Sequence, residues 1–225
     1  MVKAVVFDMF ETLVSLYRTE LYFGEHMCRD MGLTEEQFRK YWDITDDDRS
    51  TGVKRFEDTI KEILDKYNIF SEETYEKVVR KRYESRKRVF DCYREDIKPM
   101  LQAIRDRGVK IALITNCFSE EVEAIKGSDL FKYFDVPVLS FDEGVMKPDL
   151  AIYRLALERL GVEASECLYV GDGGSHELQA AKEIGMKPLQ ALWYFSDNIR
   201  TTRKPMPEFI GLKEPADALK YMDCD

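Results

Sequence analysis

Short, continuous apolar stretches recur along the chain, and longer segments with helical spacing lie between them. The first stretch, Ala4–Phe7, is rich in β-branched and aromatic residues, which is typical of a strand buried on both faces of a sheet. Three later stretches share this character and a fourth is a candidate strand: Val109–Ile114, Val136–Leu139, Cys167–Val170 and Pro188–Leu192. The pattern therefore predicts four strands and a candidate fifth.

The segments between the later strands have the period of an α-helix, and each stops at a glycine. The predicted helices are Ile97–Arg107, Ser119–Lys126, Asp149–Leu160 and Ser175–Ile184, which end at Gly108, Gly127, Gly161 and Gly185. A glycine just past a helix commonly closes it, because glycine adopts the left-handed backbone that other residues avoid. Strands that alternate with helices of this length predict an α/β fold, with a parallel sheet covered by helices on both faces.

Residues 15–88 interrupt this alternation, because they show helical spacing but no convincing strand. Apolar residues at helical intervals illustrate the pattern: Phe56, Ile60, Ile63 and Leu64. We predict an all-helical cap here, inserted between residues 1–14, the first part of the core, and residues 89–225, its remainder. The aromatic residues of the cap are expected to pack within it, although one or two of them are candidates to face a substrate: Tyr17, Tyr22, Phe23, Tyr41 and Trp42.

Charge narrows the classes of partner. The chain of 225 residues carries a formal net charge of -9, which argues against non-specific binding to nucleic acid, because such binding needs a basic face. A small anionic substrate stays compatible with this charge, since a few local cations suffice to bind one. The basic stretch Arg80–Arg88 near the end of the cap is interpreted as a solvated helix face; the alternative is that it draws anions toward a site.

The cysteines and the apolar segments indicate a cellular setting. Five cysteines are scattered along the chain without the spacing of a zinc site, so a reducing, cytoplasmic environment is the simplest interpretation. The apolar stretch near Met1 is too short for a signal peptide or a membrane span, and no interaction with a membrane is expected. A monomer and a homodimer both remain open.

Polar residues follow four of the predicted strands. Asp8 ends the first strand, Thr115 and Asn116 end the second, Lys147 lies shortly after the third, and Asp172 ends the fourth. Ligands of open α/β sheets bind beyond the carboxyl ends of the strands, so these side chains are expected to meet. Each residue alone could be a helix cap or a turn residue, and it is their combination that indicates a site.

The same four positions carry a resemblance to a known family. Phe7–Leu13 resembles the first motif of the haloacid dehalogenase superfamily, Ile114–Asn116 the second, Lys147-Pro148 the third, and Gly171–Glu177 the fourth. The resemblance implies a Rossmann-like core sheet and, from the position of the insert, the subclass with a helical cap after the first motif. Most members of the superfamily are phosphatases.

The resemblance also implies roles for these residues. Asp8 would be the nucleophile. Thr115 would act in catalysis and in substrate binding through a hydrogen bond to an oxygen of the transferring group, and Asn116 would bind the substrate. Lys147 would bind the substrate too and would offset the negative charge that gathers around Asp8.

It further implies a metal site. Asp8, the backbone carbonyl of Phe10 and Asp172 would bind Mg²⁺, which prefers oxygen ligands. Glu177 would bind a metal-bound water or would orient Lys147.

Phe10 departs from the pattern of the phosphatases, which carry a second aspartate two residues after the nucleophile. That aspartate protonates the leaving group, and a phenyl ring cannot move a proton. Glu11 would have to turn back into the site to take over the role of the missing aspartate. An aromatic residue at this position resembles the dehalogenases of the family, and Arg39 is then a candidate to bind the substrate or the halide. Against that stands Asp172, an acidic residue that dehalogenases typically lack.

Three hypotheses follow. The first is a Mg²⁺-dependent phosphatase of a small phosphorylated metabolite, acting through Asp8. The second is a carbon–halogen hydrolase of the 2-haloacid type that uses the same nucleophile. The third is a catalytically weak or non-catalytic protein that keeps the fold and binds an anion, although the joint presence of the four motifs counts against it.

Overall fold

The computed structural model describes residues 1–20, 22–196 and 204–222. Its centre is one parallel sheet of six strands in the order β3-β2-β1-β4-β5-β6. The strands are β1 Ala4–Phe7, β2 Lys110–Thr115, β3 Val136–Leu139, β4 Cys167–Gly171, β5 Lys187–Ala191 and β6 Ile210–Leu212. The predicted α/β fold is confirmed. Strand β6 was not predicted, because three residues that include a glycine show no periodic pattern.

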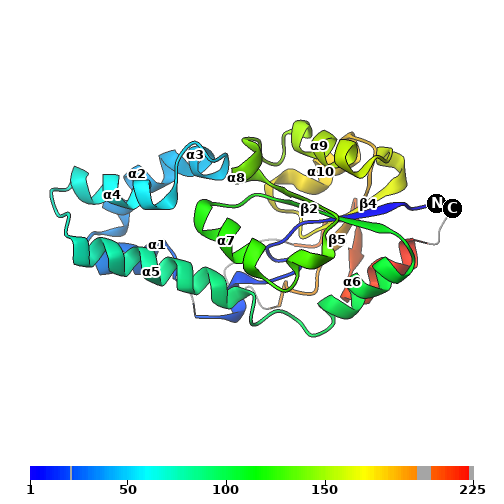
Figure 1. Cartoon of the computed structure of the whole chain (residues 1–225), viewed down its shortest axis with the longest axis horizontal. Helices are drawn as coiled ribbons and strands as arrows, with labels where there is room; N and C mark the ends of the chain where they lie inside the picture. The colour runs from blue at the N-terminus through cyan, green and yellow to red at the C-terminus, as the bar shows by residue number, and fades with distance from the viewer. Residues whose placement is uncertain (21, 197–203, 223–225) are drawn as a thin grey trace.

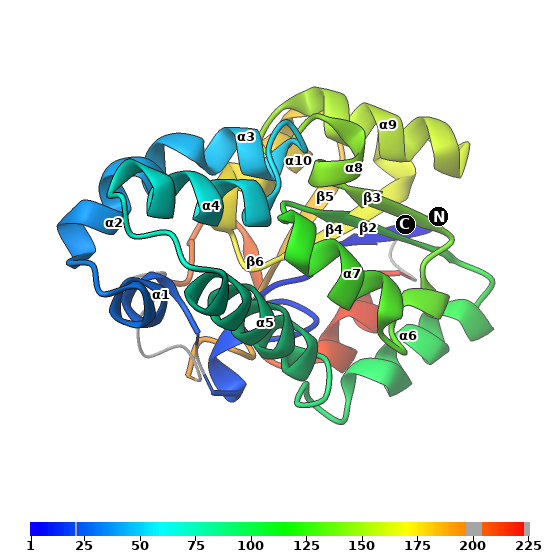
Figure 2. The same ribbon diagram turned by 60° about the vertical axis from the view of Figure 1, so that its left-hand side comes forward.

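Helices cover both faces of the sheet (Figures 1 and 2). One face packs against α6 (Ile97–Asp106), α7 (Ser119–Gly127) and a 3₁₀ helix at Pro215–Tyr221, and the other packs against α9 (Leu150–Leu160) and α10 (Glu177–Glu183). The short helix α8 (Ser140–Glu143) follows β3. All four residues of β1 are fully buried, as the continuous apolar run predicts, because Val5 and Phe7 enter one apolar layer while Ala4 and Val6 enter the other.

The loop after β4 differs from the prediction. A helix was expected from Ser175, but the chain first makes a 3₁₀ turn at Gly174–His176, in which Ser175 and His176 adopt positive φ. Helix α10 therefore begins only at Glu177. The turn places the side chain of Glu177 beneath the end of β4, where it contributes to the site described below.

Between β1 and α6, the described residues form helices joined by loops and turns and no named strand. The segment holds α1 (Gly24–Met31), α2 (Glu35–Trp42), α3 (Asp46–Ser50), α4 (Phe56–Lys66), α5 (Glu72–Val89) and short 3₁₀ turns at Leu16–Arg18 and Asp43–Thr45. These elements, hereafter the helical insert, pack around an apolar cluster of their own and lie beside the core in Figure 1. The boundaries at residues 14/15 and 88/89 stay a prediction.

The basic stretch at the end of α5 is only partly exposed. The Arg80 side chain is 66% exposed, whereas Arg82 and Arg86 are both 3% exposed and bind carboxylates of the core. The interpretation as a solvated face is therefore wrong for these two arginines. No helix in the described ranges is both long and apolar enough to span a membrane.

Candidate active site

The sheet brings the predicted strand-end residues to one edge. Asp8 follows β1, which is paired with β2 on one side and with β4 on the other; Phe7 lies beside both Leu113 and Val170. Thr115 ends β2 and Asp172 follows β4, so the three side chains lie beyond the carboxyl ends of adjacent parallel strands. All three residues are buried.

Lys147 connects two carboxylates of the site. Its Nζ lies 2.6 Å from Oδ1 of Asp8 and also forms an ion pair with Oε2 of Glu177. Asn116 holds the Lys147 backbone from both sides: its Oδ1 accepts a hydrogen bond from the Lys147 N–H at 2.8 Å, and its Nδ2 donates one to the Lys147 carbonyl at 3.0 Å. The amide of Asn116 therefore orients the loop that carries Lys147.

Glu177 is fully buried and is held by several donors. Its Oε2 accepts a hydrogen bond from the Tyr169 hydroxyl at 2.9 Å, and its Oε1 accepts one from the Gly173 N–H at 3.1 Å. A Cβ at Gly171 would collide with this carboxylate, which explains the glycine before Asp172. Of the two roles that the sequence left open for Glu177, its ion pair with Lys147 favours orientation of that lysine.

The site has more negative than positive charge. The carboxylate oxygens of Asp8, Asp172 and Glu177 lie within 4.8 Å of one another, and all three residues are buried. Burial, together with the negative charge of Asp8, raises the pKa of Glu177 above its ordinary value, although Lys147 opposes this. Burial alone would lower the pKa of Lys147, but the two carboxylates beside it raise that pKa. This crowding of oxygen ligands fits a hard divalent cation such as Mg²⁺.

Two residues near the nucleophile have structural partners. Phe10 packs its partly buried ring against the apolar core below the sheet edge. Glu11 adopts a φ of 60°, and its carboxylate accepts hydrogen bonds from the Ser15 hydroxyl and the Leu16 N–H, both at 2.9 Å. These bonds direct Glu11 toward the start of the helical insert, which counts against a role for it in proton transfer at Asp8.

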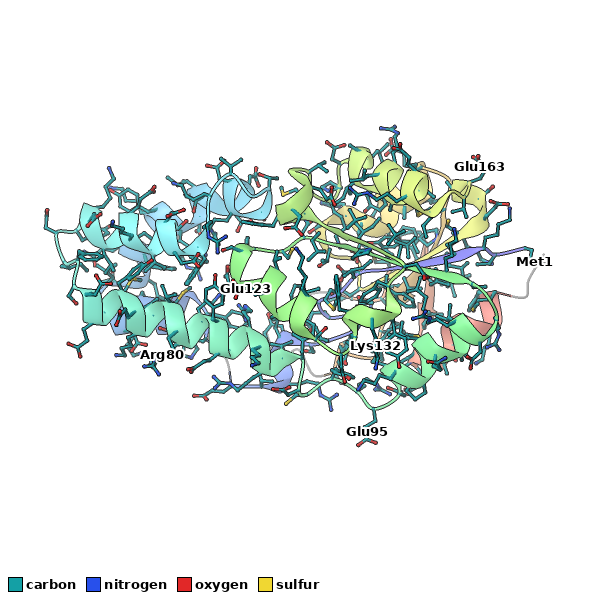
Figure 3. All side chains as sticks on the ribbon, viewed as in Figure 1. Met1, Arg80, Glu95, Glu123, Lys132 and Glu163 are labelled. Atoms are coloured by element: carbon teal, nitrogen blue, oxygen red, sulfur yellow. The ribbon has the colours of Figure 1, made fainter. Side chains whose placement is uncertain are left out.

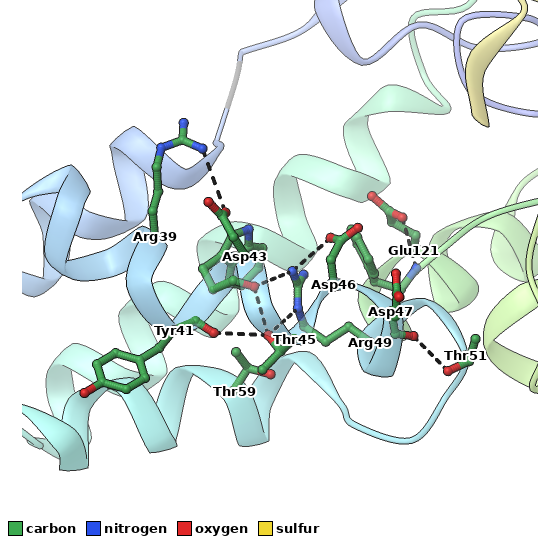
Figure 4. Close-up of polar contacts among 12 residues, drawn as sticks. Arg39, Tyr41, Asp43, Thr45, Asp46, Asp47, Arg49, Thr51, Thr59 and Glu121 are labelled. Carbon is green, nitrogen blue, oxygen red and sulfur yellow. Dashed lines mark hydrogen bonds and ion pairs between the residues drawn. The ribbon is translucent and has the colours of Figure 1, made fainter. Parts of the chain in front are cut away.

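Arg39 is not brought into this group. Its side chain is 58% exposed on α2, and its guanidinium lies 3.9 Å from a carboxylate oxygen of Glu35. It lies equally far from a carboxylate oxygen of Asp43, at 3.9 Å (Figure 4). An exposed arginine beside two helix-neighbour carboxylates has the ordinary environment of a surface residue, and the substrate-binding role of Arg39 stays a prediction.

Sequence reasoning missed two residues that support the site. Tyr169 holds Glu177, and Gln190 donates a hydrogen bond from its Nε2 to the Asp172 carbonyl at 3.0 Å. Both belong to strands that are otherwise apolar, and both are almost completely buried. A polar side chain inside a continuous apolar stretch is the signal that could have identified them, since buried polar groups need partners.

This fold and site define a class of α/β proteins in which a buried aspartate, a lysine and two further carboxylates meet beyond the carboxyl ends of a parallel sheet. The chain belongs to the haloacid dehalogenase-like hydrolases, whose family model matches residues 2–185. It is 28% identical to the phosphoglycolate phosphatase of Aquifex aeolicus over 222 residues, which cover 98% of this chain and 97% of that protein. It is also 28% identical to the glyceraldehyde 3-phosphate phosphatase of Methanocaldococcus jannaschii over 206 residues, which cover 85% and 86%.

A solved structure shares the fold of the chain. The crystal structure of a HAD phosphatase from Thermococcus onnurineus matches with a TM-score of 0.64 and 21% identity, and the match covers 98% of both chains. At this identity the likeness concerns the fold alone.

Proposed function

We propose that the chain is a Mg²⁺-dependent phosphatase of a small phosphorylated metabolite, with Asp8 as the nucleophile. The observation that carries the proposal is the buried contact between Lys147 and Asp8 at 2.6 Å, beside the carboxylates of Asp172 and Glu177. The family and the phosphatases among the relatives support it.

In the first step, an oxygen of Asp8 attacks phosphorus and the bond from phosphorus to the leaving oxygen breaks, which gives an aspartyl phosphate. The Thr115 hydroxyl donates a hydrogen bond to an oxygen of the transferring group. The ammonium of Lys147 offsets the negative charge that builds up there. Water then attacks the phosphorus and the bond from phosphorus to the Asp8 oxygen breaks. Inorganic phosphate leaves, the proton lost by the attacking water passes to the solvent, and the carboxylate of Asp8 is restored.

Asp8, Asp172 and the Phe10 carbonyl are the residues that would hold Mg²⁺. The bound cation would neutralise part of the charge that Asp8 and the phosphoryl group bring together. Lys147 alone offers one positive charge against the three carboxylates of the site, so this additional positive charge completes the electrostatic balance.

Phe10 determines which leaving groups can depart, because it stands where a proton donor would be. A phenyl ring donates no proton, and the carboxylate of Glu11 is bonded to Ser15 and Leu16. The leaving oxygen therefore departs as an anion or takes a proton from water. Acyl phosphates, aryl phosphates and anhydrides, whose leaving anions are stable, are the favoured substrates.

The second candidate function is hydrolysis of a carbon–halogen bond. Phe10 favours it, because a halide leaves without a proton. The acidic cluster that includes Asp172 stands against it, since this chemistry needs no metal. The phosphatase therefore remains the first proposal.

The test is a panel of alkyl phosphates, aryl phosphates, acyl phosphates and 2-haloacids, assayed with Mg²⁺ and with chelator. Asp8→Asn protein serves as the blank. Release of phosphate that requires Mg²⁺ supports the proposal. Release of halide at equal rates in chelator would replace it by the second candidate.

A further inference from the structure

Five consecutive core residues, Cys117–Glu121, form a contact surface for the helical insert. We call them the docking segment; they follow Thr115 and Asn116 directly, and the last three of them, from Ser119 on, form the start of α7. Ser119 Oγ accepts a hydrogen bond from the Phe56 N–H at 2.9 Å, so the first residue of α4 is bonded to the core. Ser140 Oγ accepts from the Cys117 N–H at 3.0 Å and donates to the Ser50 carbonyl at 2.7 Å, which ties α3 to the same segment.

The next two residues of the docking segment bind arginines of α5. Arg82 Nε lies 2.8 Å from Oε1 of Glu120, and Arg86 Nε lies 3.0 Å from Oε1 of Glu121. The four side chains are between 0% and 6% exposed, so both ion pairs are shielded from water. Removal of one partner from such a pair leaves a buried charge without compensation, whereas removal of both restores the balance.

Arg49 completes the contact at Phe118. Its side chain is fully buried, and its guanidinium lies over the Phe118 ring at 4.5 Å and over the Trp42 ring at 3.6 Å. Figure 4 shows hydrogen bonds from this guanidinium to Thr45 and Asp46 within the insert. Phe118 is thus the core residue on which a charged side chain of the insert is seated.

The docking segment is continuous with the loop that orients the lysine of the site. Cys117 follows Asn116, and the Asn116 amide holds the Lys147 backbone through its two hydrogen bonds. Any displacement of the segment would move Asn116, and with it the ammonium that lies 2.6 Å from Asp8.

We propose that Arg49, Arg82 and Arg86 are positioning residues, which set Asn116 and Lys147 by holding the docking segment. The site is then fully assembled only when the insert is seated on the core. The predicted effect on kcat rests on the proposed function. The predicted contact between the insert and the core does not, because it is measured by the accessibility of Trp42.

The test uses Arg86→Gln, Glu121→Gln and the double variant, with Arg86→Lys as the conservative replacement. Arg80→Gln on the exposed face of α5 and Glu123→Gln on α7 are matched controls (Figure 3). Each variant is made in a Trp193→Phe background, whose own values are the reference, so that Trp42 is the remaining tryptophan. For each, kcat and KM toward an aryl phosphate, the Tm, and the quenching of Trp42 fluorescence by acrylamide are measured.

We expect the two single neutral variants to lower kcat by about 10–10²-fold, because a small displacement of a reacting group has an effect of this size, and to change KM much less. Trp42 should become more accessible to acrylamide. The double variant and Arg86→Lys should recover part of kcat, and the exposed controls should match the reference. A lowered Tm with kcat and Trp42 quenching unchanged would overturn the inference, as would equal effects in the controls.

The inference and the proposed function can fail separately. If the wild-type protein releases no phosphate from phosphate esters, acyl phosphates or anhydrides in the presence of Mg²⁺, the proposed function fails. Trp42 quenching still decides whether the buried arginines seat the insert: quenching that is the same in all variants overturns the inference. If a variant does not fold, Arg86→Lys, which keeps the charge, supplies the comparison.

Discussion

Lys147 and Asp8 are 139 residues apart in the chain, yet the lysine Nζ lies 2.6 Å from the aspartate Oδ1 in a buried site. The contact exists because Asp8 directly follows β1, one of the two middle strands, and Asn116, directly after the neighbouring strand β2, fixes the backbone of the lysine.

Asp8→Asn should reduce turnover of every substrate by on the order of 10⁴-fold or more, because an amide is a far poorer nucleophile than a carboxylate. The protein should still fold, since Lys147 keeps Glu177 as its partner. Steady-state turnover and thermal unfolding of the same preparation measure the two effects. Substantial activity in a folded variant that mass spectrometry shows to be free of deamidation would remove Asp8 from its proposed role.

Mg²⁺ should stabilise the protein as well as activate it. A ligand that binds only the folded state at a hundred times its Kd stabilises by about 2.7 kcal/mol, which for a chain of this size raises Tm by roughly 5–10 °C. Asp172→Ala should abolish the shift, because it removes one of the three clustered carboxylates. Differential scanning fluorimetry with and without chelator measures it, and Asp58→Ala, on the exposed surface of α4, is the control. An equal shift in both variants would place the cation elsewhere.

Asp30 should give the helical insert a stability that is lost in acid. Partial burial disfavours its charge, but hydrogen bonds from Lys77, Lys81 and Tyr22 prevail and lower the pKa of Asp30 to about 2. A lowered folded-state pKa means that the stabilisation is present above the ordinary pKa near 4 and disappears as the pH falls toward 2. Urea unfolding of wild type and Asp30→Asn at pH 6 and pH 3 should show their difference shrink by about 1–2 kcal/mol. A difference independent of pH would contradict this assignment.

The core was largely predictable from the sequence, whereas the contacts of the insert were not. A continuous apolar run identifies β1 because both faces of that strand are covered. The burial of Arg82 could not be predicted, since its partner Glu120 lies 38 residues away on another helix and no local pattern links the two. Arg39 was selected for its position after the first motif, but position along a helix does not determine which face the fold covers.

Phe10 leads to the prediction that separates the candidate functions best. With no acid two residues after Asp8, the rate should depend steeply on the leaving group, so a plot of log kcat/KM against leaving-group pKa should have a large negative slope. Aryl and acyl phosphates should react fast and alkyl phosphates slowly. Phe10→Asp should flatten the slope and raise turnover of alkyl phosphates by about 10²-fold where the new carboxylate reaches the leaving oxygen. Phe10→Asn, whose side chain has the size of aspartate but no transferable proton, should do neither.

Glu11→Gln in the wild-type background should leave the slope unchanged, because the carboxylate it replaces is bonded to Ser15 and Leu16. Equal rates for alkyl and aryl phosphates in the wild type, lost in Glu11→Gln, would instead identify Glu11 as the proton donor and end the argument from Phe10.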